Sequence, residues 1–177
     1  MALSLAACGD SKTKTADIPS GEPSSSASTA TITTPTKTEP SKPGRVAHGA
    51  NEKNLEQKPK IPKPTGDPPT ELKKVDIVKG DGPVARKGQS VTVQYVGVAW
   101  STGEEFDASW GKGEPFKFKL GQGMVIPGWD EGVVGMRVGG RRQLQIPSEL
   151  AYGAQGSPPS IGPNEALVFD VDLLKVK

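Results

Sequence analysis

The chain has 177 residues, with 22 Lys and Arg against 20 Asp and Glu, and a single cysteine and a single histidine. Residues 69–177 hold 13 basic and 13 acidic side chains, and a segment without net charge lacks the electrostatic footprint of a nucleic-acid-binding domain. Cys8 alone cannot form an internal disulfide or a cysteine metal site, and His48 alone cannot supply histidine-based nucleophilic catalysis. We therefore expect no nucleic-acid partner, no metal and no cofactor.

The composition divides the chain into a polar arm and one domain. All nine aromatic residues lie at or beyond Tyr95, whereas ten of the seventeen prolines lie at or before Pro69. The arm contains only scattered apolar residues, too few to offset the entropy lost on ordering. We therefore predict a disordered linker rich in Ser, Thr, Pro and Lys over residues 9–69, followed by a single folded domain over residues 70–177.

The first eight residues end in Leu5-Ala6-Ala7-Cys8, which resembles a bacterial lipobox. This resemblance implies that residues 1–8 are the remnant of a lipoprotein signal peptide, with a lipid on Cys8 and the linker as a spacer at the extracytoplasmic face of a membrane. A complete leader also has a basic segment and an apolar stretch of roughly 7–15 residues, which residues 1–8 do not contain. The alternative is an authentic start without a signal peptide, and hence a cytoplasmic protein with a polar tail.

Beyond the arm, apolar and polar residues alternate in a series of short stretches. Period-two alternation predicts strands with one buried and one solvated face, which is typical of antiparallel sheets. The predicted strands are residues 72–79, residues 89–99, a short strand carrying Phe106 and Asp107, residues 116–120, residues 141–146 and residues 166–176. Core positions on these strands include Phe118, Leu120, Leu144 and Val171.

One stretch, residues 124–136, has helical rather than strand periodicity. Ile126, Trp129 and Val133 fall on one helix face, Pro127 suits the first turn, and Gly135 can end the helix. So short a helix must be held by packing. We therefore predict an α+β domain in which a curved antiparallel sheet of five to six strands wraps around one short helix. A helical turn at 147–150 and a glycine- and proline-rich loop at 151–163 precede the last strand.

Six motifs, in this order, resemble those of the FKBP-type peptidyl-prolyl cis-trans isomerases. They are Val93-Gln94-Tyr95-Val96-Gly97, Phe106-Asp107, Pro115-Phe116-Lys117-Phe118, Val125-Ile126-Pro127-Gly128-Trp129, Ala151-Tyr152-Gly153 and Leu167-Val168-Phe169-Asp170-Val171. The resemblance covers about residues 72–177. It implies the same sheet-around-helix fold and an isomerase that acts on X–Pro bonds.

The resemblance also implies a site. Trp129 would form the floor of a pocket under the substrate proline, and the Ile126 N–H and the Tyr152 hydroxyl would donate to substrate carbonyls. Asp107 would lie at the pocket edge and orient Tyr95. Further wall and substrate-binding positions would be Phe106, Phe116, Val125, Ala151, Ile161 and Phe169. Without the resemblance, most of these apolar residues would be read as plain core. Lys112 stands where the family often has an arginine, and lysine cannot make a planar two-pronged pairing.

The function implied is faster rotation about X–Pro bonds in unfolded or folding proteins, by desolvation in an aromatic pocket. The alternative is a proline-peptide-binding module or holdase chaperone with little turnover. The expected partners are prolyl segments of such proteins and macrolide immunosuppressants, together with a membrane contacted through a lipid on Cys8. We expect the protein to be a monomer.

Overall fold

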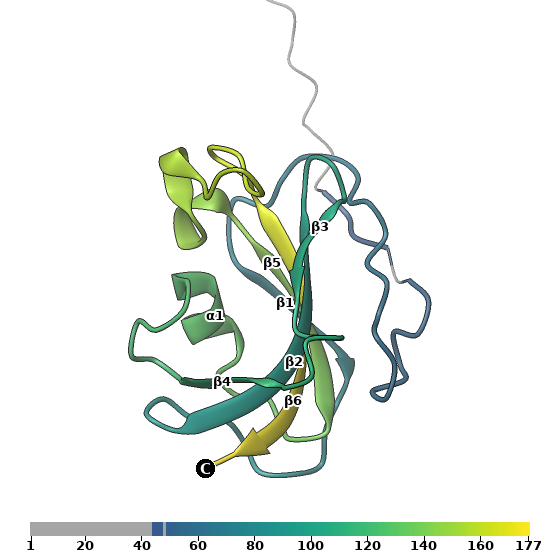
Figure 1. The fold of residues 1–177 in the computed structure, drawn as a ribbon, viewed down its shortest axis with the longest axis vertical. Coiled ribbons are helices and arrows are strands. Elements are labelled where there is room, and N and C mark those ends of the chain that lie inside the picture. The colour runs from purple at the N-terminus through teal and green to yellow at the C-terminus, as the bar shows by residue number, and fades with distance from the viewer. Residues whose placement is uncertain (1–43, 48) are drawn as a thin grey trace, which may run out of the picture. The chain divides into compact units, whose positions relative to one another are not determined.

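The computed structural model describes residues 44–47 and 49–177, so the predicted signal remnant, Cys8 and most of the predicted linker lie outside the described residues. Figure 1 shows a curved antiparallel sheet with a single short helix on one side. The strands are ordered β1-β5-β6-β2-β3, and β4 also pairs with β2. Among the described residues, no helix is long and apolar enough to cross a membrane. The predicted α+β architecture is confirmed.

The elements lie close to their predicted positions. The strands are β1 (Lys73–Val78), β2 (Ser90–Ala99), β3 (Glu105–Ala108), β4 (Phe116–Lys119), β5 (Gly140–Ile146) and β6 (Leu167–Val176), and the helices are α1 (Pro127–Gly132) and two single 3-10 turns, η1 (Ser148–Leu150) and η2 (Gly153–Gln155). The longest pairings run from β2 to β6 and from β5 to β6. The three inner strands β5, β6 and β2 therefore join the two edges of the sheet.

Helix α1 packs directly onto β5 because two of its residues have no side chain. A Cβ atom on Gly128 would lie 2.4 Å from Ile146 Cγ2, and one on Gly132 would lie 2.7 Å from Leu144 Cδ1. The helix ends at Gly132, earlier than Gly135, and the Gly135 N–H donates to Ala85 O at 2.9 Å instead of to a helix carbonyl. Arg142 Nη1 donates to Gly132 O at 2.8 Å, the last carbonyl of the helix, and to Val134 O at 3.1 Å in the turn that follows. A cation at this end of the helix is also stabilised by the negative end of the helix dipole.

The inner face of the sheet and the helix enclose the main apolar core. Trp129, Val133 and Met136 from the helix and the turn after it meet buried side chains from four strands and the loops between them. Its strand and loop members are Ala85, Val91, Val93, Phe118, Leu120, Leu144, Ile146, Ile161, Leu167, Phe169, Val171 and Leu173. Burial of these side chains holds the short helix, which would be marginal alone.

The outer face of the sheet differs from the prediction, because it is covered instead of solvated. Asp170 and Asp172 are each only 2% exposed, although they alternate with core residues along β6. The cover is made by residues 44–47 and 49–66, here called the strap, which Figure 1 shows in blue on the side of the sheet opposite α1. Val46 and Ile61 of the strap share a second apolar cluster with outer residues of the sheet, namely Val96, Val98, Trp100, Ala108, Ala166 and Val168.

A buried arginine attaches the strap to the sheet. Arg141 on β5 pairs with Asp172 on β6 through Nε and Nη2, at 2.5 and 2.6 Å. The same guanidinium donates to three strap carbonyls: Asn51 O at 2.7 Å, Glu52 O at 2.9 Å and Gln57 O at 3.2 Å. The strap, which falls within the predicted disordered linker, is therefore packed against the sheet. The composition predicts disorder here because the strap has few apolar residues. Hydrogen bonds to a distant strand also order the strap, and composition does not reveal them.

Candidate active site

A cavity of about 270 Å³ opens between the inner face of the sheet and the start of helix α1. Its lining comes from β2, β3, β4, β6, the helix and the loops beside it. The lining residues are Tyr95, Phe106, Asp107, Phe116, Met124, Val125, Ile126, Trp129, Tyr152 and Phe169. Six of these ten are aromatic, so the cavity suits an apolar ring.

Trp129 lies at the floor of this cavity and is only 4% exposed. Its ring meets Tyr95 edge-on at a centroid distance of 5.1 Å and Phe169 at 5.2 Å. Such perpendicular pairs are a preferred aromatic geometry and fix the indole against its neighbours. In the described part of the chain, no hydrogen-bond acceptor faces the buried Trp129 Nε1. The floor is therefore rigid and poor in polar partners.

The aromatic walls approach one another over a strand residue without a side chain. Phe106 and Phe169 meet edge-on at 5.5 Å, above Gly97 of β2. A Cβ atom on Gly97 would lie 2.6 Å from Phe169 Cε1 and 2.8 Å from Phe106 Cζ. Gly97 thus shapes the cavity without lining it, and no sequence pattern other than its place in the Tyr95 motif indicates this role.

Two hydrogen-bond donors at the cavity have no partner in the described residues. Ile126 precedes the helix, and its N–H donates to none of them, although its carbonyl accepts from the Trp129 N–H at 2.9 Å. The Tyr152 hydroxyl also bonds to none of them, and this residue is 41% exposed. Asp130 holds the loop before Ile126 by accepting from the N–H groups of Gly121 and Gly123, each at 2.8 Å. The cavity therefore presents two donors that a ligand carbonyl can use.

Among the described residues, Asp107 is the only carboxylate that lines the cavity. Its Oδ2 accepts from the Tyr95 hydroxyl at 2.5 Å, and its Oδ1 pairs with the Lys112 ammonium. Burial raises the pKa of Asp107, but the hydrogen bonds from Lys112 and Tyr95 outweigh it and hold that pKa below its usual value. Burial and the neighbouring carboxylate raise the pKa of Tyr95 above its ordinary value. At neutral pH Asp107 is therefore ionised and Tyr95 stays a proton donor toward it.

This arrangement does not place a base against a nucleophile. The hydroxyl of Tyr95 is already committed to Asp107, and no group of three or more His, Cys, Asp or Glu side chains that could hold a metal occurs among the described residues. The chemistry that the cavity offers is exclusion of water from an apolar ring together with hydrogen bonds to carbonyls.

Comparison with known proteins agrees with this geometry. The family model described as FKBP-type peptidyl-prolyl cis-trans isomerase matches residues 82–174. The chain belongs to this family. It is thus a peptidyl-prolyl cis-trans isomerase, and the resemblance drawn from the six motifs is confirmed.

Individual relatives are similar to this chain over more than half of its length. The FK506-binding protein of Streptomyces anulatus is 58% identical over 121 residues, which cover 68% of this chain and 98% of that protein. The peptidyl-prolyl cis-trans isomerase FPR2 of Saccharomyces cerevisiae is 53% identical over 93 residues, 52% of this chain and 69% of that protein. The crystal structure of AtFKBP13 is similar with a TM-score of 0.57 and 39% identity, over 62% of this chain and 96% of that one.

The FKBP cavity brings together most of the residues that the sequence proposed for the site. Nine of the eleven candidates line it: Tyr95, Phe106, Asp107, Phe116, Val125, Ile126, Trp129, Tyr152 and Phe169. Ile161 does not, because its side chain is buried in the main core, and Ala151 packs against the same core instead of facing the cavity. Ile161 lies in the glycine- and proline-rich loop at 151–163, and Ala151 directly precedes Tyr152. Closeness to site residues along the chain does not determine whether a side chain points into the cavity.

Met124 is a cavity residue that the six motifs do not include. This residue lines the FKBP cavity and is 64% exposed, the most exposed of the large apolar side chains among the described residues. The signal available was its position directly before Val125 and Ile126. A methionine in a loop is otherwise unremarkable, and only the bond network around Asp130 brings this loop to the cavity mouth.

Proposed function

We propose that the enzyme accelerates rotation about X–Pro bonds in unfolded or folding proteins, with the proline ring seated over Trp129. The observation that carries this proposal is the unpartnered Ile126 N–H at the wall of a cavity that is otherwise mainly aromatic. An unpaired donor beside an apolar ring site matches the two halves of a prolyl segment, which are a pyrrolidine ring and a carbonyl.

The physical basis is the loss of polarity when the peptide bond twists. Resonance gives this bond a rotational barrier of about 18–20 kcal/mol, and a right-angle twist destroys the resonance and much of the charge separation. Transfer from water to an apolar cavity therefore disfavours the planar forms more than the twisted one. Each tenfold gain in rate needs only about 1.4 kcal/mol, so a few kcal/mol of differential solvation suffices.

The polar groups of the site then have positioning roles. The Ile126 N–H and the Tyr152 hydroxyl donate to substrate carbonyls and hold the chain on either side of the turning bond. Asp107 fixes the Tyr95 ring through the 2.5 Å hydrogen bond and so keeps one wall of the cavity in place. No covalent intermediate and no proton transfer to the substrate is required.

The test is a prolyl-peptide isomerisation assay that uses no coupling protease. Trp129→Leu should lower kcat/KM by roughly tenfold or more, because it removes the ring that seats the proline. Trp110→Leu is the matched control, since Trp110 packs against the outer cluster and does not line the cavity. Tyr152→Phe should lower turnover less, because it removes a single hydrogen bond.

The same assay separates the enzyme from the alternative of a peptide-binding module or holdase. Saturable binding of a prolyl peptide without any increase in isomerisation rate would favour the alternative. Unchanged activity in both Trp129→Leu and Tyr152→Phe would show that the reaction takes place elsewhere.

We also propose that the cavity binds macrolides such as FK506, the compound after which the Streptomyces relative is named. The six aromatic residues that line it provide the apolar surface such a ligand needs. Competitive inhibition of the isomerase by FK506 tests this, and Met124→Glu should weaken inhibition by placing a charge at the cavity mouth. Absence of inhibition at saturating FK506 would reject macrolide binding while leaving the isomerase intact.

For the arm, we propose lipid attachment at Cys8, on the Leu5-Ala6-Ala7-Cys8 motif. A lipid there would place the isomerase at the extracytoplasmic face of a membrane, where it would assist secreted chains. In a detergent-partitioning experiment the full-length precursor should enter the detergent phase, and Cys8→Ser should abolish this. Equal partitioning of the two proteins would reject the anchor.

A further inference from the structure

A second cavity, of about 210 Å³, lies between β1, β5 and the turn that follows helix α1. Its lining residues are Asp76, Val78, Lys79, Gly80, Gly135, Met136, Arg137, Gly140 and Arg142. None of these residues lines the FKBP cavity. Anything bound here would therefore act independently of the prolyl site.

Arg142 forms the inner wall of this second cavity and is held rigidly. It is only 8% exposed. Its Nε donates to Asp76 Oδ1 at 2.5 Å, and its Nη1 donates to Gly132 O at the end of the helix and to Val134 O in the turn that follows. Within the described part of the chain, Nη2 has no acceptor. A guanidinium fixed on two sides and free on the third is preorganised to receive an acceptor oxygen.

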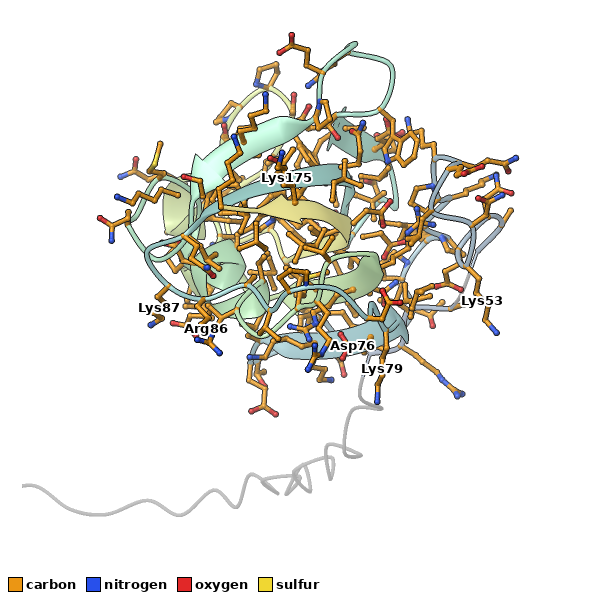
Figure 2. All side chains as sticks on the ribbon, turned by 90° about the horizontal axis from the view of Figure 1, so that it is seen from below. Lys53, Asp76, Lys79, Arg86, Lys87 and Lys175 are labelled. Atoms are coloured by element: carbon orange, nitrogen blue, oxygen red, sulfur yellow. The ribbon has the colours of Figure 1, made fainter. Side chains whose placement is uncertain are left out.

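Two further cations surround the mouth of the cavity. Lys79 and Arg137 both line it and are exposed. Lys79 has no ion-pair partner among the described residues, and Arg137 Nη1 donates only to the Gly82 carbonyl, at 3.2 Å. Asp76 is the single acidic residue of the lining. Figure 2 shows Lys79 beside Asp76, whereas Arg86 and Lys87 lie on a separate loop.

We propose that this cavity, here called the basic cavity, is a binding site for a small, doubly charged oxyanion of the phosphate class. Three cations face one carboxylate, so the lining carries an excess of positive charge. A fixed arginine together with mobile cations at the rim is an arrangement suited to phosphate oxygens. The isomerase reaction uses neither Arg142 Nη2 nor Lys79. The proposed function therefore does not explain why three cations lie around one cavity.

The test is titration of the full-length protein with inorganic phosphate, followed by amide chemical shifts, at an ionic strength held constant with chloride. The shifts should concentrate at Gly80, Gly135 and Gly140, whose backbone lines the basic cavity. The double variant Lys79→Gln/Arg137→Gln should bind phosphate roughly five- to tenfold more weakly, since two exposed charge contacts are lost. The control Arg86→Gln/Lys87→Gln removes the same charge outside the cavity and should bind as the unmodified protein does.

Equal weakening in the two double variants, or shifts spread over all surface lysines, would overturn the proposal in favour of general charge screening. O-phosphoserine distinguishes the sources of the phosphate group. Binding equal to that of inorganic phosphate means that a monoester is accepted, and binding of inorganic phosphate alone means that the site takes the free ion. Isomerase turnover in Lys79→Gln/Arg137→Gln should be unchanged, so the result does not depend on the prolyl site.

Discussion

The two sides of the sheet differ in whether their hydrogen-bond donors are paired. On the inner side, beside the aromatic floor of the cavity, the Ile126 N–H and the Tyr152 hydroxyl have no hydrogen-bond partner among the described residues. On the outer face, Arg141 alone makes five hydrogen bonds, to Asp172 and to strap carbonyls. Unsatisfied donors are costly when buried and useful when a ligand can reach them. The difference indicates that the inner face serves binding and the outer face serves stability.

The largest expected effect is a loss of stability on the outer face. Arg141→Met should lower the free energy of unfolding by about 3–5 kcal/mol, because it leaves the Asp172 carboxylate buried and unpaired. Urea unfolding measures this loss. The double variant Arg141→Met/Asp172→Leu should recover part of it by removing the stranded charge. If Arg141→Met unfolds at the same urea concentration as the unmodified protein, the pair does not hold the strap.

A second prediction concerns pH and the same face. Burial raises the pKa of Asp170 to about 7, even though Gln143 Nε2 donates to it at 3.1 Å, with Glu52, Arg141 and Asp172 as the neighbouring charges. The folded state therefore holds this proton more tightly than the unfolded state, whose carboxyl titrates near pH 4. The stability contributed by protonated Asp170 is complete below about pH 4 and is lost as the pH rises to about 7.

Asp170→Asn removes this titration and sharpens the comparison. The variant should gain stability relative to the unmodified protein as the pH rises from 4 to 7, by on the order of 2–4 kcal/mol. Urea unfolding at pH 4, 5.5 and 8 measures the difference. A constant difference between the two proteins across these pH values would show that Asp170 titrates normally.

The third prediction moves to the inner face. Gly97→Ala should lower kcat/KM by about tenfold, because the added methyl must displace Phe169 or Phe106 from the cavity wall. Overpacking should also cost about 1–3 kcal/mol of stability. The control is Ala85→Gly, a core change outside the cavity. Gly88→Ala would not serve, because Gly88 has a positive φ. Loss of stability with full activity would mean that the rings adjust freely.

The smallest effect is expected at the edge of the strap. Lys58 and Glu105 pair at 2.6 Å, but both side chains are about 40% exposed, at 41% and 42%. Exposed ion pairs contribute little, so Lys58→Ala should change the free energy of unfolding by less than about 0.5 kcal/mol. A loss comparable to that of Arg141→Met would show that charge at the rim, and not the buried guanidinium, attaches the strap.

Much of the fold could be predicted from local pattern. Alternation placed the strands, because side chains on a strand point to opposite faces with period two. The Ile126, Trp129 and Val133 spacing placed the helix, although the chain leaves the helix before Gly135, whose N–H donates to the distant Ala85 carbonyl. The six motifs also identified nine residues of the cavity, because each strand or loop motif carries its own site residue.

Tertiary structure alone decided the remainder. Asp170 and Asp172 alternate as solvated residues would, and only the strap makes them buried. The strap in turn has too few apolar residues to indicate order, and it packs because Arg141 supplies donors from a strand about ninety residues away. The sequence by itself determined which side chains share a face of each element. What covers that face depends on contacts between distant segments, which no local periodicity records.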